Sequence, residues 1–325
     1  MHTHTFRYLL SRPRLFAPAL LALALAGAGC NDGASADDVP DGVIRVVATT
    51  SMIADLARAI GGDAVHVEGL MGPGVDPHLY RASEGDVARL AGADVVLYNG
   101  LHLEGRMAEV LERMEGLGIA SEAVGEAVPD SLRITSELFQ GSIDPHVWMD
   151  PSLWKFAARA AAERFAAADP RNTVAYGRRL AAFELRLDSL DGWARRRVAE
   201  LPPEQRVLVT AHDAFGYFGR AYGFEVHGLQ GISTATEAGT ADVHRLAALV
   251  AQQRIPAMFV ESSVPPRAIE AVRAAVRSRG HDVAIGGNLF SDALGDPASG
   301  ADTYEGMIRH NVTAIVDGLV GNAGE

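Results

Sequence analysis

The strongest constraint on the fold is the alternation of strand-like and helix-like segments along most of the chain. Runs such as VIRVVATT at 43–50 and RVLVTAH at 206–212 are rich in β-branched residues, and a segment with apolar residues at helical spacing follows each. The other predicted strands are 65–71, 94–100, 224–229, 256–262 and 282–287. The predicted helices are 51–62, 82–92, 102–115, 152–169, 214–223, 240–254, 265–280 and 302–320. This alternation predicts parallel β-sheets flanked by helices.

One long helix is predicted between the two halves, over 170–201. Its apolar residues recur every three or four positions and form one stripe: Tyr176, Leu180, Phe183, Leu187, Leu190, Ala194, Val198 and Leu201. Pro202 and Pro203 end it, and its length is about 46 Å at 1.5 Å per residue. We therefore predict an α/β protein with two lobes, 43–169 and 202–325, each a mainly parallel β-sheet flanked by helices, joined by this rigid helix. A coiled coil is the alternative for 170–201.

The N-terminal segment reads as a secretory signal rather than as part of the fold. Arg7, Arg12 and Arg14 precede an apolar run over 15–25, which is too short for a membrane anchor and ends in AGAGC. We predict a signal peptide over 1–29, with Cys30 as a lipidation site and 30–42 as a lipid-anchored flexible tether. Cleavage elsewhere, with Cys30 left as a free thiol, is the alternative.

The charge of the chain excludes one class of partner. The formal net charge is -12 over 325 residues, whereas nucleic-acid binding needs a basic surface that displaces counterions. We expect no nucleic-acid partner.

Several groups that can bind a metal follow predicted strands or precede predicted helices. His78 follows the strand 65–71, His212 ends the strand 206–212, and Asp292 follows the strand 282–287. His146 precedes the helix 152–169. Ligands of open parallel sheets bind beyond the carboxyl ends of strands, so these four residues form one possible metal site.

The tripeptide Asp-Pro-His occurs twice, at 76–78 and 144–146. Proline fixes its own φ and makes the preceding residue extended, so each histidine is presented from a stiff corner. Asp76 and Asp144 are candidates for partners that orient an imidazole, and Glu237 is a third candidate in this role. A plain turn is the alternative for a single copy, and the repetition favours a site.

Five segments resemble the TroA-type zinc- and manganese-binding proteins of bacterial ABC importers. They are GVDPHLY, DPHVWMDP, HDAFGYFGRAYGFEVHGLQGISTATEAG, MFVESSVPPRAIEAV and GGNLFSDALG, and the resemblance extends over most of 43–320. It implies a fold of two α/β lobes joined by one long helix. It also implies one Zn²⁺ or Mn²⁺ per chain, bound between the lobes by His78, His146, His212 and Asp292. Residues 103–145 contain no histidine, so the His-rich loop of some zinc-dedicated members is absent.

The resemblance further implies an extracytoplasmic lipoprotein, in the periplasm or on the cell surface, that passes zinc, manganese or iron to a permease. We expect a monomer that is not an enzyme; adhesion is a role known only at the level of the family. Three imidazoles and one carboxylate favour zinc, and many manganese members have glutamate where this chain has His212.

The sequence leaves two rival functions open, a secreted zinc-dependent hydrolase and a binding protein for a non-metal solute. The hydrolase would use Glu237 or Glu261 as a general base. Four protein ligands close a zinc site, whereas catalytic zinc usually keeps an open position, and no HExxH motif occurs. His102 is a candidate auxiliary ligand. The remaining histidines after the signal segment are expected to be structural: His66, His227, His244, His281 and His310.

Overall fold

The computed structural model describes residues 39–136 and 141–321. The predicted signal peptide over 1–29 and Cys30 lie outside these residues, as does most of the predicted tether. Among the described residues, no helix is both long enough and apolar enough to cross a membrane.

The first lobe is built on a four-stranded parallel sheet with the strand order β2-β1-β3-β4. Its strands are β1 Ile44–Ala48, β2 Val65–Gly69, β3 Val95–Tyr98 and β4 Ala120–Ala123. Its helices are α1 Ser51–Gly61, α2 Glu84–Ala91, α3 Ala108–Gly116 and α4 Pro151–Ala168. A short antiparallel pair, β5 Thr135–Ser136 and β6 Ser142–Ile143, precedes α4.

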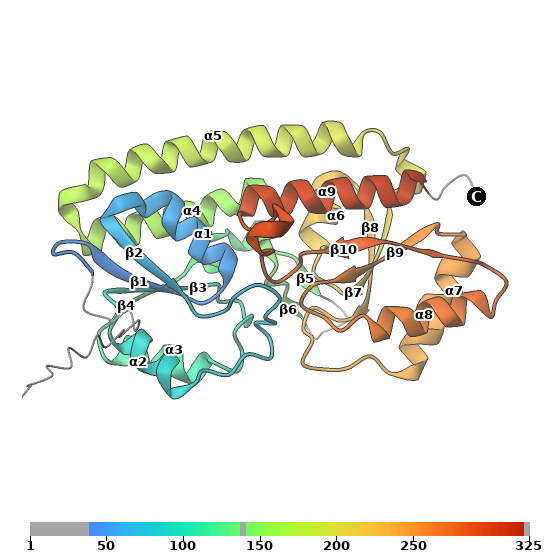
Figure 1. Ribbon diagram of the computed structural model, residues 1–325, viewed down its shortest axis with the longest axis horizontal. Helices are drawn as coiled ribbons and strands as arrows, with labels where there is room; N and C mark the ends of the chain where they lie inside the picture. Colours follow the sequence, from blue (N-terminus) through green and yellow to red (C-terminus); the bar gives the residue numbers. More distant parts are fainter. Residues whose placement is uncertain (1–38, 137–140, 322–325) are drawn as a thin grey trace, which may run out of the picture. The chain divides into compact units, whose positions relative to one another are not determined.

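Side chains that alternate along the strands supply two separate cores, one on each face of this sheet. Val46 and Ala48 of β1 pack with α1 and α4, whereas Val47 between them packs with α2 and α3. Figure 1 shows the same layers, with α1 and α4 on one side of the sheet and α2 and α3 on the other. The continuous apolar run of β1 therefore follows from burial on both faces.

The second lobe contains two parallel strand pairs that lie side by side. β7 Val207–His212 pairs with β8 Glu225–Gln230, and β9 Ala257–Glu261 pairs with β10 Ala284–Leu289. β7 also lies next to β9. The helices of this lobe are α6 Gly216–Tyr222, α7 Thr240–Gln253, α8 Arg267–Arg277 and α9 Tyr304–Gly321.

The long helix is present as α5, Thr173–Val198, and a 3₁₀ turn over Pro170–Asn172 leads into it. Its 26 residues correspond to about 39 Å, somewhat less than the prediction. Seven of the eight predicted stripe residues are buried, and Leu180 is partly buried. The helix packs on α1 and α4 of the first lobe and on α6 and α9 of the second (Figure 1). One continuous core along α5 therefore joins both lobes.

Candidate metal site

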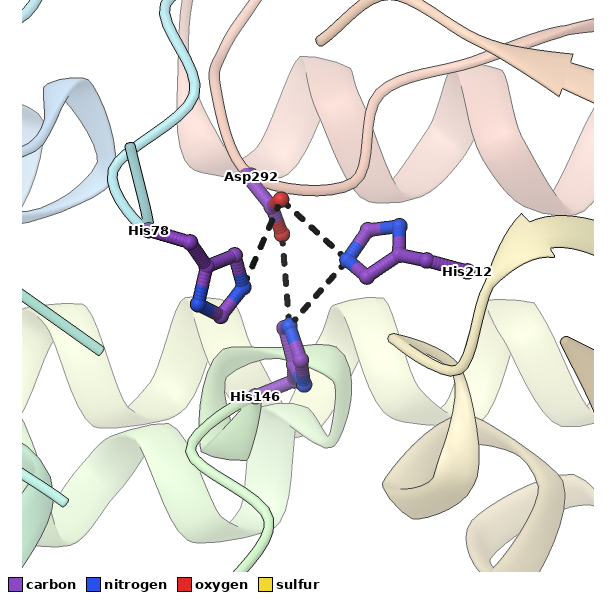
Figure 2. A group of neighbouring side chains, drawn as sticks. All are labelled: His78, His146, His212 and Asp292. Carbon is purple, nitrogen blue, oxygen red and sulfur yellow. Dashed lines mark hydrogen bonds and ion pairs between the residues drawn. The ribbon is translucent and has the colours of Figure 1, made fainter. Parts of the chain in front are cut away.

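Four side chains from four separate loops or strand ends meet in one buried group (Figure 2). His78 lies in the loop after β2, and His146 lies three residues after β6. His212 is the last residue of β7, and Asp292 follows β10. The exposed fraction is 4% for His78, 1% for Asp292 and 0% for the other two. The structure thus brings together all four residues that the sequence suggested as metal ligands.

The distances between these side chains suit a single four-coordinate ion. The Asp292 carboxylate lies 3.2 Å from His212 Nε2, 3.4 Å from His146 Nε2 and 3.8 Å from His78 Nε2. The Nε2 atoms of His146 and His212 are 3.4 Å apart. Each of the four residues offers one nitrogen or carboxylate oxygen as a ligand atom, and these four atoms lie within 4.8 Å of one another. A tetrahedral zinc site with bonds of about 2.0–2.2 Å has edges of about 3.3–3.6 Å.

Three atoms that face the centre of this group have no hydrogen-bond partner among the described residues. They are Nε2 of His78 and both carboxylate oxygens of Asp292. Buried polar atoms are nearly always paired, so an unpaired set that converges on one point indicates a bound group. A divalent cation at that point would satisfy all three atoms at once.

Buried carboxylates contact the outward-facing nitrogens of two of the histidines. Asp144 Oδ1 lies 2.7 Å from His146 Nδ1, and Glu261 Oε2 lies 2.6 Å from His212 Nδ1. A carboxylate can only accept at these positions, so each Nδ1 carries a proton, and each Nε2 is the atom that faces the centre, where an ion would replace any second proton. Such outer partners fix the tautomer and the orientation of metal-ligating histidines.

The two Asp-Pro-His segments fold alike around the histidine backbone. The His78 N–H donates to Asp76 Oδ1 and the His146 N–H donates to Asp144 Oδ1, each over 2.9 Å. Their remaining contacts differ. Asp144 also reaches the ring of its histidine, whereas Asp76 Oδ2 accepts a hydrogen bond from the Thr234 hydroxyl of the second lobe.

A buried polar network supports the His146 loop from the strand ends of the first lobe. The Asn99 side-chain amide donates to the Pro145 carbonyl over 3.1 Å, directly before His146. Glu104 in turn accepts from the Asn99 N–H and from the Thr49 hydroxyl, and burial raises the pKa of its carboxyl. The ligand loop is therefore tied to the ends of β1 and β3.

Two of the suggested auxiliary residues lie apart from this group. Glu237 is exposed and lies 3.6 Å from Arg267, and His102 is exposed in the turn after β3. The carboxylate that contacts His212 is instead that of Glu261, which the sequence suggested only as a general base. One sequence signal could have identified it: Glu261 lies at the end of a predicted strand, 256–262, as His212 ends the strand 206–212.

The electrostatics of the group favour a cation. Burial lowers the pKa of His78 to about 3, so this imidazole is neutral at pH 7. Burial also acts to lower the pKa of His146, but Asp144 and Asp292 outweigh it and raise the pKa to about 9. Burial likewise acts to lower the pKa of His212, but the carboxylates of Asp292 and Glu261 outweigh it and raise the pKa well above its usual value. Against the effect of its burial, His212 and His146 hold the pKa of Asp292 well below its usual range.

Comparisons with known proteins show the family of this chain. The family model of zinc-uptake complex component A, periplasmic (ZnuA), matches residues 46–318. The chain is 49% identical over 300 residues to the zinc-binding protein TroA of Treponema pallidum (strain Nichols), covering 92% of this chain and 96% of TroA. It is 47% identical over 309 residues to the manganese-binding lipoprotein MntA of Bacillus subtilis (strain 168), covering 95% of this chain and 99% of MntA.

A solved structure has the same fold. The periplasmic zinc-binding protein TroA from Treponema pallidum superposes with a TM-score of 0.83 at 51% identity, covering 86% of this chain and 99% of that one. The family model, which matches 46–318, spans both lobes, the long helix and the segments that carry the four buried side chains. With the family model spanning 46–318, the chain belongs to the ZnuA family of periplasmic metal-binding proteins.

Proposed function

We propose that this protein captures one divalent transition-metal ion outside the cytoplasm and delivers it to the permease of an ABC importer. The observation that carries the proposal is the buried convergence of three imidazole nitrogens and one carboxylate on a single point. His78, His146, His212 and Asp292 are the proposed ligands, and Asp144 and Glu261 hold two of the imidazoles in the ligating tautomer.

Zinc is the ion that the donor set favours. The relatives are named for both metals, zinc for TroA and manganese for MntA, so their names do not decide. Imidazole suits zinc and also iron, whereas manganese prefers carboxylate and other oxygen donors. Three nitrogens against one carboxylate therefore support zinc as the more tightly bound ion, with manganese or iron as the alternative cargo.

Binding rather than catalysis is supported by the closed donor set. Four protein ligands occupy the tetrahedral positions of zinc, whereas catalytic sites usually keep one for water. Glu261 contacts the Nδ1 atom of His212, on the side of the ring away from the centre of the group, and Glu237 is exposed near Arg267. Neither carboxylate is placed as the general base that the hydrolase alternative requires.

The remaining features of the proposal concern location and organisation. We propose that Cys30 carries a lipid anchor and that 30–42 tethers the binding protein to the membrane beside its permease. The lobes span 43–169 and 202–325, the helix over 170–201 joins them, and the protein acts as a monomer. The family description, periplasmic component of a zinc-uptake complex, supports this location.

Metal titration of the tag-free protein tests the proposal. We expect one tight zinc equivalent per chain, because the four ligands form one closed site. His146→Ala should lose tight binding, and His66→Ala, at an exposed position in β2, is the matched control that should retain it. Two equal sites, no site, or unchanged binding by His146→Ala would contradict the proposal.

A further inference from the structure

Among the described residues, one short hydrogen bond joins the two lobes at the His78 loop. The Thr234 hydroxyl, in the loop between β8 and α7, donates to Asp76 Oδ2 over 2.6 Å. Thr234 itself is buried, with 6% of its surface exposed, but Ala235 next to it and Leu79 next to His78 are exposed. The bond therefore lies just beneath the solvent-exposed surface of the two loops.

Asp76 connects this bond directly to a proposed ligand. Its other oxygen, Oδ1, accepts the His78 N–H over 2.9 Å. One carboxylate thus spans from the second lobe to the backbone of the residue that presents the imidazole. A shift of the Thr234 loop would move Asp76 and, with it, the backbone of His78.

His78 is also the least supported of the three imidazoles. Carboxylates hold the Nδ1 atoms of His146 and His212, but within the described part of the chain none holds that of His78. Its contact with Asp292, at 3.8 Å, is the longest of the three imidazole–carboxylate contacts. The position of His78 consequently depends on its backbone, and so on Asp76.

The loop of Asp292 is fastened to the other lobe differently. The Leu294 N–H donates to the Ser51 hydroxyl over 2.8 Å, and the Trp148 indole donates to the Ser291 carbonyl over 2.8 Å. These bonds tie the residues on both sides of Asp292 to the first lobe. Trp148 and Leu294 are part of the continuous core that runs along α5, so opening there would disrupt apolar packing. The Thr234–Asp76 bond can break without that cost.

We propose that Thr234 is a positioning residue that holds His78 on the ion across the two lobes, and that its bond to Asp76 sets how long the ion stays bound. The inference rests on the proposed function and adds a means of release to it. Breaking one hydrogen bond near the surface frees the least supported ligand, while the other three stay in place. Release would therefore begin at His78.

Zinc dissociation from the full-length protein tests the inference, measured by stopped-flow mixing of zinc-loaded protein with excess chelator. Thr234→Val replaces the hydroxyl with a methyl group of similar shape, and Thr234→Ser keeps a hydroxyl. Ser233→Ala is the matched control, because the Ser233 hydroxyl accepts a local bond from the Ala235 N–H and has no hydrogen bond to the first lobe within 39–136 and 141–321. A hydrogen bond to a charged group contributes enough that we expect about tenfold faster dissociation for Thr234→Val.

Two further readouts separate positioning from a general structural effect. Thr234→Val should bind one zinc with an association rate close to that of the wild type, and Thr234→Ser should restore slow dissociation. In a double-mutant cycle, Asp76→Ala should remove the effect of Thr234→Val. The inference would be overturned if zinc dissociated from Thr234→Val at the wild-type rate. It would also be overturned if zinc dissociated from Ser233→Ala or Thr234→Ser as fast as from Thr234→Val. Failure of the wild type to bind one zinc would instead refute the proposed function.

Discussion

Glu261→Gln should weaken zinc binding more than Asp144→Asn, although both changes remove one buried negative charge beside a proposed ligand. The difference follows from how each carboxylate is used. Glu261 accepts the His212 N–H with Oε1, over 2.8 Å, and meets His212 Nδ1 with Oε2, over 2.6 Å. Asp144 meets both the N–H and Nδ1 of His146 with the same oxygen, Oδ1.

An amide has one accepting oxygen, so the two variants differ in what they leave unpaired. In Asp144→Asn, the amide can keep its single oxygen at the Oδ1 position and still accept from both donors of His146. In Glu261→Gln, the amide can accept from only one donor of His212. If its NH₂ faces Nδ1, the imidazole must move its proton to Nε2, the atom that faces the ion. If it faces the backbone, a buried N–H loses its partner, at a cost of about 1–3 kcal/mol.

Outer partners of metal-ligating histidines contribute about 10–100-fold to affinity, and we expect the two variants to span this range. Asp144→Asn should weaken zinc binding by about tenfold and Glu261→Gln by about 100-fold, a further difference of about 1.4 kcal/mol. Competition titration against a chromophoric chelator measures both constants, and circular dichroism verifies that each variant is folded. An affinity of Glu261→Gln within about threefold of the wild type, or a larger loss for Asp144→Asn, would refute this reasoning.

Three other outcomes can be measured on the same protein. His146, with a pKa of about 9, and His212, with a raised pKa, each carry a second proton at pH 7. Zinc binding should therefore release about two protons at pH 7, and the apparent zinc affinity should rise as the pH increases toward 9. Calorimetry in buffers of different ionisation enthalpy measures the number of protons released, and a release of zero would contradict this prediction. His212→Glu should lower the ratio of zinc affinity to manganese affinity, because a harder oxygen ligand replaces a nitrogen ligand. His212→Ala should weaken the binding of both ions, and undiminished binding by this variant would exclude His212 as a ligand. Leu187→Ala in the core along α5 should lower the free energy of unfolding by about 2–5 kcal/mol in urea titrations, whereas Leu185→Ala, at an exposed position, should leave it nearly unchanged.

Local sequence patterns predicted most of the elements, but in the first lobe they missed the short strands β5 and β6 and two further features. The predicted helix over 102–115 begins only at Ala108, because Gly100, Leu101 and His102 all have positive φ and form a turn. The strand β4, Ala-Ser-Glu-Ala, was not predicted, since it lacks the β-branched residues that mark a strand. It exists because its backbone pairs with β3 at the edge of the sheet.

The sequence by itself determined which side chains could meet, because residues that end parallel strands, or that lie in stiff Asp-Pro-His corners, are presented at one edge of the sheets. His78, His146, His212 and Asp292 were all identified in this way. Asp144 was also suggested as a partner of His146, but tertiary structure alone decided the partners that come from distant parts of the chain. Glu261 contacts His212 because β9 lies beside β7, and Thr234 reaches Asp76 across the lobes, over 158 positions of the chain. Such contacts depend on how strands and lobes pack, which no local periodicity encodes, so the sequence could place Glu261 at the end of a strand but not beside His212.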